Sequence, residues 1–416
     1  MVVFGLLFVG LLLVVPDAVL AQSTRPFELQ WSEVYADFFV CSIVQAQDDG
    51  FMIAGYTTTR HFVSSLIKVN SGGDVEWLKT YPEITASPRL QVVDSGYILS
   101  SSRSGWLKTD LQGNIQWSKQ FGFLPERASI PWVILEEDDS YVMLKSGYSI
   151  GRTSYSLWKY GVDDVLLWDK YVGEAGVGDV LLSSGDGYYV VGTRDQKGWF
   201  TKWDLEGEVV WSRTYNYKTL GEASLVFVSI IETLDGGFLL IGYNDRDSWV
   251  VKTDRNGREQ WHRQYDRYVV LGDDVLYNYD CSVRCVVEVG GGGYLVFRGM
   301  EVVVLGSRGN ELGVGSYFEY DSELDGLGVV RVESVVGVVG DDGCLVVAVT
   351  YRTATHSNYP GLFDGPSYLW VAGFALEPTF QSDDNVLLFG VVAILVVVVL
   401  VFVCFWFLKN KKVKCC

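Results

Sequence analysis

Short apolar runs alternate with glycine-rich and acidic turns from Phe27 to Pro378, and no part of this stretch keeps a helical period. The segment "DGGFLLIGYNDRDSWVVKTDRNGREQWHRQY", residues 235–265, shows the pattern most clearly. It contains a glycine turn, an apolar run, a lysine, a second turn and a tryptophan. Apolar runs bounded by such turns are typical of β-strands joined by hairpins. With the apolar run in front of it, one unit predicts four antiparallel strands in about 50 residues.

Weaker copies of this unit recur along the chain, with a lysine and a tryptophan nine residues apart. The five pairs are Lys68 and Trp77, Lys108 and Trp117, Lys159 and Trp168, Lys202 and Trp211, and Lys252 and Trp261. The tryptophans are 40 to 51 residues apart, a period typical of propeller blades. A turn glycine such as Gly257 stands four residues before the tryptophan. The third copy has Asp164 in that position, and its Tyr171 comes one residue early.

The second turn of the unit suggests how its lysine and tryptophan are related. Asn256 and Gly257 predict a two-residue type I′ loop, because both positions of that turn need a positive φ. Such a loop places Lys252 opposite Trp261 on one face of the hairpin. We expect the ammonium to lie near the indole, a cation–π contact worth about 0.5–1 kcal/mol where exposed. The recurring lysines and tryptophans are therefore interpreted as structural residues rather than ligand contacts.

The number of blades follows from two separate signals. An acidic or glycine turn followed by an apolar strand occurs seven times, at Gly50, Gly96, Ser140, Gly187, Gly236, Gly293 and Gly343. The tryptophan strand has a degenerate sixth copy, with Gly313 in the tryptophan position, and no copy after Gly343. The missing copy is "LQWSEVY" near the other end, with Trp31 and Tyr35 at the repeat spacing. We expect an all-β, seven-bladed β-propeller of four-stranded antiparallel blades, residues 27–378, closed by its N-terminal strand.

The unit K-x-D-x-x-G-x-x-x-W resembles the repeat of the pyrroloquinoline-quinone-like (quinoprotein-like) propellers, D-x-x-[TN]-G-x-x-x-W, over nearly all of residues 27–378. The resemblance implies the fold but no single activity. That family includes dehydrogenases that use the quinone with calcium and many non-enzymatic members that bind or scaffold proteins. A dehydrogenase of this family would need calcium ligands and a catalytic aspartate on the axis, often beside a vicinal disulfide. Residues 22–385 contain no Cys-Cys pair.

Both ends of the chain are apolar. Residues 1–21 end in small residues and predict a signal peptide cleaved after Ala21; an uncleaved anchor is the alternative, since no basic residue precedes the apolar run. Val386 to Leu408 contain no charge and would span about 34 Å as a helix, enough to cross a bilayer. The tail at 409–416, "KNKKVKCC", is basic and predicts a cytoplasmic end. We therefore expect a single-pass cell-membrane protein with the propeller outside, joined through a linker at 379–385.

The formal net charge is −18, from 51 acidic and 33 basic residues. An acidic ectodomain does not favour binding of nucleic acid or of anionic lipid headgroups through net charge. It fits solubility, cationic partners or a salty environment.

Few residues suggest chemistry. Asp321, Glu323 and Asp325 resemble the start of a calcium loop, but Val332 stands where the closing bidentate acid is needed, so a solvated acidic loop is the favoured interpretation. The motif "GYSIG" at 147–151 matches a nucleophile elbow, yet it lies between predicted strands rather than before a helix. The histidines are too scattered to form a metal motif: His61, His262 and His356.

Four cysteines lie in the predicted ectodomain, where disulfides can persist. Cys281 and Cys285 are four residues apart and, in a strand, about 13 Å apart, too far to bridge. Cys41 and Cys344 fall in the first and last blades, which ring closure brings side by side. A disulfide between them is the hypothesis; two small buried apolar residues are the alternative.

Taken together, these features predict a membrane-anchored binding or scaffold propeller for an extracellular protein or small ligand. We expect no enzymatic activity, no catalytic residue and no cofactor. The alternative is a surface quinoprotein-like dehydrogenase that uses a quinone with calcium.

Overall fold

The computed structural model describes residues 27–57, 62–85, 88–101, 104–120, 132–136, 140–149, 152–174, 176–183, 185–217, 224–266, 268–270, 278–280, 283–299, 301–316, 330–340, 344–353 and 367–376. The predicted signal peptide, linker, membrane helix and basic tail lie outside these residues. Within the described ranges, no helix is long and apolar enough to cross a membrane.

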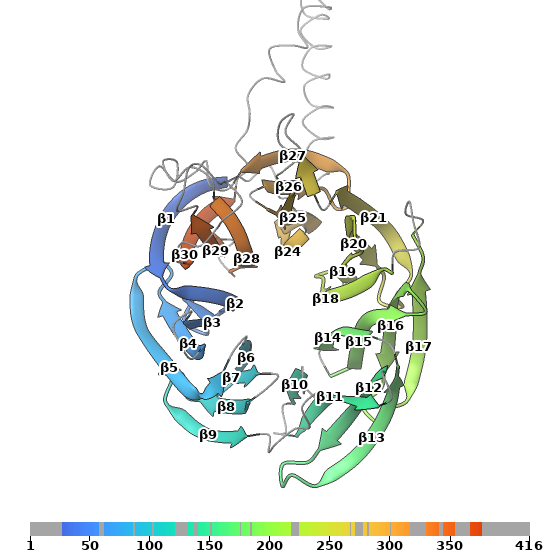
Figure 1. Cartoon of the computed structure of the whole chain (residues 1–416). Helices are drawn as coiled ribbons and strands as arrows, with labels where there is room; N and C mark the ends of the chain where they lie inside the picture. The colour runs from blue at the N-terminus through green and yellow to red at the C-terminus, as the bar shows by residue number, and fades with distance from the viewer. Residues whose placement is uncertain are drawn as a thin grey trace, which may run out of the picture.

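Seven four-stranded antiparallel sheets surround a central axis as blades (Figure 1). Blade one contains β2 (Phe38–Gln45), β3 (Phe51–Thr57), β4 (Val63–Val69) and β5 (Val75–Thr85). Blade two contains β6 (Arg89–Val93), β7 (Gly96–Ser101), β8 (Gly105–Thr109) and β9 (Ile115–Gln120). Blade three contains β10 (Trp132–Leu135), β11 (Tyr141–Ser149), β12 (Arg152–Tyr160) and β13 (Leu166–Gly173). Blade four contains β14 (Gly176–Ser183), β15 (Gly187–Arg194), β16 (Lys197–Trp203) and β17 (Val209–Tyr215).

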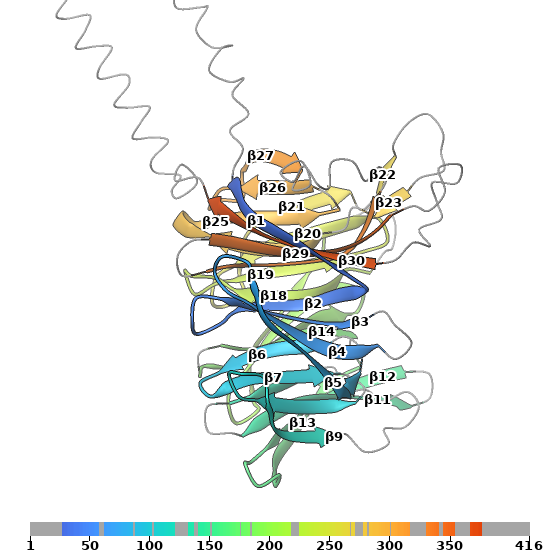
Figure 2. The ribbon, with the colours of Figure 1, turned by 90° about the vertical axis from the view of Figure 1, so that its left-hand side faces the viewer.

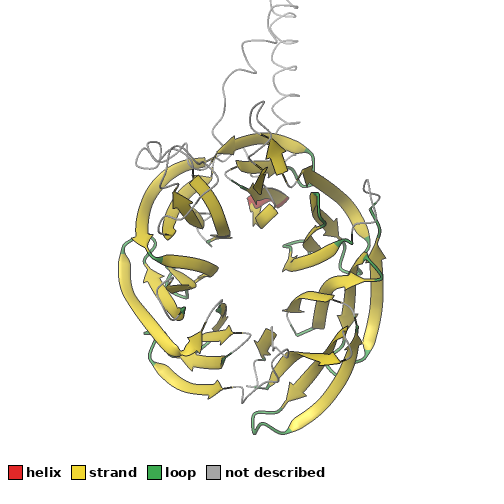
Figure 3. Cartoon of the chain, in the orientation of Figure 1, coloured by secondary structure: helices red, strands yellow, loops and turns green. Residues whose placement is uncertain are grey.

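The remaining blades follow the same order. Blade five contains β18 (Val226–Glu232), β19 (Phe238–Tyr243), β20 (Asp247–Thr253) and β21 (Glu259–Asp266). Blade six contains β24 (Val283–Val289), β25 (Gly293–Arg298), β26 (Glu301–Leu305) and β27 (Glu311–Ser316). Blade seven contains β28 (Val330–Val339), β29 (Cys344–Thr353), β30 (Ser367–Leu376) and β1 (Phe27–Ala36). Besides the blades there are a small hairpin of β22 (Tyr268–Val270) and β23 (Asn278–Asp280) and one turn of 3-10 helix, η1 (Gly290–Gly292) (Figure 3).

The N-terminal strand closes the ring, as the sequence predicts. β1 pairs antiparallel with β30, with Phe27 opposite Leu376 and Ala36 opposite Tyr368. The last blade is therefore built from both ends of the propeller. Because the ring is closed, the first and last blades contact each other, and neither exposes a sheet face to water at that junction.

Burial explains the apolar pattern of the strands. The inner strands of a blade pack on both faces, so that all seven residues of β20 are buried. Outermost strands such as β17 alternate between exposed and partly buried side chains, because one face packs on the next blade and the other faces water. The apolar core lies between neighbouring blades: one cluster joins Phe38 and Ile53 of blade one to Val346 and Leu369 of blade seven.

The antiparallel order gives the ring two different faces. Turns between first and second strands lie at one end of the blades, together with the turns between third and fourth strands of blades one to six; we name this end the turn face. The loop face, at the opposite end, carries the connections between second and third strands and between successive blades. Figure 2 shows the ring from its edge, with the strands running between the two faces. Phe27 and Leu376 are paired at the turn face, so both ends of the propeller are there.

The turn at Asp254–Gly257 differs from the predicted type I′ loop. Gly257 has a φ of 68°, but Asn256 does not have a positive φ. The N–H of Gly257 donates to the carbonyl of Asp254 (3.0 Å) and the N–H of Asp254 to the carbonyl of Arg258 (2.9 Å). This is a type I turn followed by a glycine bulge. The predicted register is nevertheless confirmed: Lys252 lies opposite Trp261, because the bulge restores the pairing.

Candidate functional site

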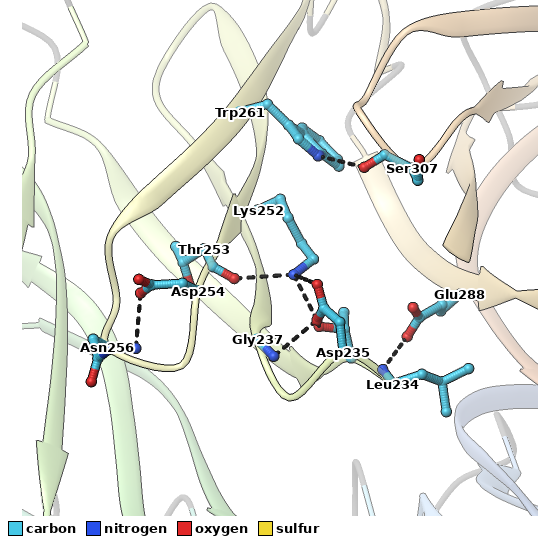
Figure 4. A network of polar contacts seen from close by, with 11 residues as sticks. Leu234, Asp235, Gly237, Lys252, Thr253, Asp254, Asn256, Trp261, Glu288 and Ser307 are labelled. Atoms are coloured by element: carbon cyan, nitrogen blue, oxygen red, sulfur yellow. Dashed lines mark hydrogen bonds and ion pairs between the residues drawn. The ribbon is translucent and has the colours of Figure 1, made fainter. Parts of the chain in front are cut away.

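The repeat lysines of four blades are paired with an acid from the turn between the first two strands of the same blade. Lys252 is 99% buried, and its Nζ lies 2.9 and 2.8 Å from the two carboxylate oxygens of Asp235 (Figure 4). It also donates to the carbonyl of Thr253 (3.1 Å). The corresponding pairs are Lys68 with Asp48, Lys159 with Glu136, and Lys202 with Asp186. The expected cation–π contact between Lys252 and Trp261 is therefore corrected: the ammonium bonds to the acidic turn.

The glycine of that acidic turn makes room for the lysine. A Cβ at Gly237 would lie 2.5 Å from Nζ of Lys252. The N–H of Gly237 donates to Asp235 (2.9 Å). Burial raises the pKa of Asp235, but hydrogen bonds from Lys252, Thr233 and Gly237 outweigh it and hold the pKa below its usual value. The acid, the glycine and the lysine are thus one structural unit.

The repeat tryptophan serves the next blade. The indole of Trp211 lies on Gly257, and a Cβ there would be 2.6 Å from the ring. The same contact joins Trp31 to Gly73, Trp77 to Gly113, Trp168 to Gly207, and Trp261 to Gly309. Trp261 also donates from Nε1 to the carbonyl of Ser307 in blade six (3.0 Å; Figure 4). Each turn glycine therefore receives an indole from the preceding blade.

A basic residue two positions after the tryptophan completes this junction. Lys79, Lys119 and Arg213 hold their charges 5.5, 5.6 and 5.7 Å from the centroids of the tryptophan rings before them. Lys79 also donates to the carbonyl of Gln112 in blade two (2.6 Å). The pattern W-x-[KR] is present in all five copies, but its spacing alone did not predict a contact with the next blade.

A polar layer on the axis is the clearest cluster of charge outside the repeats. The residues of this layer occupy one equivalent position on the innermost strand of five blades. Each pairs with a second-strand residue, which lies two positions beyond the residue opposite the repeat lysine. In blade six, Val304 takes the place of the repeat lysine. These equivalent residues are Ser42, Arg89, Asp179, Ser229 and Cys285. They therefore lie at one level of the axis.

Arg89 and Asp179 form an ion pair across this layer. Nη1 of Arg89, in blade two, lies 2.8 Å from Oδ1 of Asp179, in blade four. The second oxygen of Asp179 accepts the N–H of Ile230 in blade five (3.2 Å). Asp179 is buried, whereas Arg89 remains partly exposed along the axis. This arrangement connects three blades and spans the short inner strand of blade three.

The thiols near this layer are poor nucleophiles. Burial raises the pKa of Cys41 to about 12, although the charge of Arg89 opposes the rise. Burial likewise raises the pKa of Cys285 to about 12. Both thiols are therefore protonated at neutral pH, and the thiolate is the reactive form.

The hypothesis of a Cys41–Cys344 disulfide is wrong for this structure. The N–H of Val40 donates to the hydroxyl of Thr350 (2.8 Å), which fixes how blades one and seven lie side by side. Cys344 is six residues from Thr350 in the same strand, about 20 Å away at the usual rise of a strand. A disulfide needs Cα atoms within about 7 Å. Cys41 is a free thiol.

Other sequence candidates contribute no site. Asp321, Glu323 and Asp325 lie outside the described residues, as do His61 and His356. His262 is on the rim in β21, with Nδ1 2.7 Å from Glu259. Within the described ranges, no group of three His, Cys, Asp or Glu side chains could hold a metal ion. The described residues of the polar layer include one carboxylate, already bonded to Arg89, and do not fit a calcium-bound quinone.

Comparisons with known proteins show the fold alone. No model of a known protein family matches the sequence, and no curated protein matches it. BBS1N, solved in complex with ARL6DN, is 13% identical with a TM-score of 0.51 over 86% of this chain and 98% of that one. The WD40 β-propeller domain of Doa1 is 13% identical with a TM-score of 0.50 over 86% and 100%. BamB from Moraxella catarrhalis is 11% identical with a TM-score of 0.40 over 80% and 99%.

Proposed function

We propose that this protein is a single-pass cell-surface protein whose β-propeller is a non-enzymatic binding or scaffold module, related to the pyrroloquinoline-quinone-like propellers. The observation that carries the proposal is the pairing of Phe27 with Leu376. Both ends of the propeller leave from the turn face. The nine residues between Leu376 and the expected anchor, which include the linker at 379–385, reach about 30 Å at full extension. An anchor at 386–408 therefore keeps the turn face toward the membrane and leaves the loop face and the rim for partners.

The chemistry of the turn face supports this orientation. Each third-to-fourth-strand turn of blades two, four and five begins with an aspartate whose carboxylate accepts turn N–H groups: Asp110, Asp204 and Asp254. An ionised carboxylate is costly to move into the hydrocarbon core of a bilayer. The turn face would stand off the bilayer rather than insert into it.

The chemistry of the axis supports a binding role. The charges of Arg89 and Asp179 neutralise each other, and the nearby thiols are protonated. Buried repeat lysines such as Lys252 are held in ion pairs within their blades. These groups are engaged in structural contacts, which favours partner recognition on the outside of the ring.

The proposal is tested with epitope tags on the full chain expressed in cells. A tag between Asp195 and Gln196, on the loop face, should be accessible on intact cells. A tag after Cys416 should become accessible only after permeabilisation. Energy transfer to a lipid dye should be stronger from a label at Asn256, on the turn face, than from one at Gln196. Release of the protein into the medium, or a C-terminal tag that is accessible on intact cells, would refute the proposed topology.

Enzymatic activity is tested separately on the purified protein. The protein is titrated with the free quinone and calcium while the quinone absorbance and dye reduction are followed. We expect no saturable change. Saturable binding together with substrate-dependent dye reduction would establish the dehydrogenase alternative instead.

A further inference from the structure

The seven blades allow one position to be compared within the same fold. The residue just before the repeat tryptophan faces outward on the rim. It is polar in blades one, two and five, where it is Glu76, Gln116 and Gln260. In blades three, four and six it is Leu167, Val210 and Leu312, which are 56%, 55% and 49% exposed. Because three blades form with a polar residue there, the fold does not require an apolar one.

A second outward position in blade three is also unusual. The residue three positions after the tryptophan is Thr80, Gln120, Thr214 or Gln264 in blades one, two, four and five, and Val34, 40% exposed, in blade seven. In blade three it is Tyr171, which is 62% exposed. Val172 instead fills the buried position that a tyrosine occupies in blades one, four and five. This explains why the tyrosine of the third copy comes one residue early: it is no longer the core residue of the repeat.

Two of these side chains share one face of β13, since Asp169 and Tyr171 alternate along the strand and point the same way. Leu167 is exposed next to them at a bulge, where no residue of β12 pairs with it. Trp158 lies opposite Asp169 in β12 and is partly exposed, whereas Leu107, Thr201 and Val251 at the equivalent positions are fully buried. Nζ of Lys145 caps the Trp158 ring at 3.6 Å from its centroid. We name Trp158, Leu167, Asp169 and Tyr171 the blade-three rim.

The carboxylate at the centre of the blade-three rim belongs to Asp169 and could bind a cation of a partner. The carboxylate of Asp169 is exposed and makes no ion pair or hydrogen bond with any residue in the described part of the chain. Its neighbour Lys170 points to the other side of the strand and pairs with Glu208 in blade four. A carboxylate between two exposed apolar side chains is complementary to a cation flanked by apolar groups.

We propose that the blade-three rim binds an extended segment of a partner protein, with a lysine or arginine between two apolar residues at positions i − 2 and i + 2. The segment would add to β13, which is the outermost strand of its sheet. Its basic side chain then lies opposite Asp169, and its apolar side chains contact Tyr171 on one side and Leu167, at the bulge, on the other. This inference rests on the proposed binding function. It assigns that function a surface on the rim, away from the turn face and the membrane.

The test uses the full chain in detergent and two labelled peptides, followed by fluorescence anisotropy. One peptide has Val-Thr-Lys-Thr-Val at its centre, and the other has Glu in place of Lys. We expect the lysine peptide to bind about tenfold more tightly than the glutamate peptide. The double variant Leu167→Gln/Tyr171→Thr should weaken binding of the lysine peptide about tenfold or more, and Asp169→Asn should remove most of the discrimination between the peptides. Leu78→Gln, on the rim of blade one, is the matched control and should bind as the wild type does.

The double variant is designed to leave the fold intact, since it introduces residues that other blades carry at the same positions. Thermal unfolding of Leu167→Gln/Tyr171→Thr should match that of the wild type. Failure of the lysine peptide to bind, equal binding of both peptides, or unchanged binding by the double variant would refute the proposal. A wild-type dimer that the double variant converts to a monomer would also refute it, by showing a second copy on this surface. Surface display in the epitope assay does not depend on these residues, so the two proposals fail separately.

Discussion

The indole of Trp211 lies so close to Gly257 of the following blade that a Cβ on this glycine would be 2.6 Å from the ring. Gly257 also has a φ of 68°, in the region that side chains with a Cβ avoid. The hydroxyl of Tyr215, four residues after the tryptophan, donates to the carbonyl of the same glycine (2.7 Å). One turn thus receives two side chains from the preceding blade, and the turn and the tryptophan depend on each other.

Gly257→Ala should destabilise the propeller by about 2–4 kcal/mol, from backbone strain together with overpacking against Trp211. Urea unfolding followed by tryptophan fluorescence measures the change. Gly313→Ala is the matched control, because a Cβ at Gly313 meets no atom within 4 Å. We expect it to be neutral or slightly stabilising. Equal losses in both variants would show that the indole contact is not the cause.

Breaking the Lys252–Asp235 pair should give unequal losses. Lys252 is buried and Asp235 is about half exposed. Asp235→Asn leaves a buried ammonium without its counterion and should cost about 3–5 kcal/mol. Lys252→Met leaves a carboxylate that water can reach and should cost less. A double-mutant cycle should show strong coupling between Lys252 and Asp235 and almost none between Lys252 and Trp261. The reverse order of the two losses would contradict the observed burial.

Stability should decrease as the solution becomes acidic, because turn aspartates are stabilised as anions. Hydrogen bonds lower the pKa of Asp186 and Asp235 below the ordinary value of 3.8. The unfolded chain then takes up these protons at a higher pH than the folded chain does. The free energy of unfolding therefore falls as pH drops from about 4 through the lower folded pKa values. Urea midpoints between about pH 5 and pH 2 measure this slope, and Asp186→Asn and Asp235→Asn should each make it shallower.

Deletion of residues 27–36 should weaken the whole ring. The deletion removes β1 from blade seven, exposes the edge of β30 and takes away the contact of Trp31 with Gly73. We expect the thermal midpoint to fall by roughly 10 °C or more. Deletion of residues 22–26 leaves β1 whole and is the control. An unchanged midpoint after the longer deletion would show that closure contributes little to stability.

The sequence by itself determined the number of blades, their strand order and the closing strand. These features depend on local signals, since an apolar run and its turn residues are neighbours in the chain. It also determined the pairing of Lys252 with Trp261, although the turn type was wrong. A type I′ loop and a type I turn with a glycine bulge both need Gly257 and both give this pairing, so the pattern could not separate them.

Only the tertiary structure decided which residues each repeat residue contacts. The acid of Lys252 is 17 residues before it, and the glycine of Trp211 is 46 residues after it, so a recurring spacing shows that these residues matter without showing their partners. Gly313 illustrates the same limit. It occupies the tryptophan position of blade six. The last two strands of blade seven come from opposite ends of the chain, so that no turn connects them. Blade seven therefore has no turn glycine that could receive an indole from blade six. The separation of Cys41 from Cys344 and the pairing of Arg89 with Asp179 likewise depend on how strands from different blades lie beside one another, a relation that the local sequence pattern does not contain.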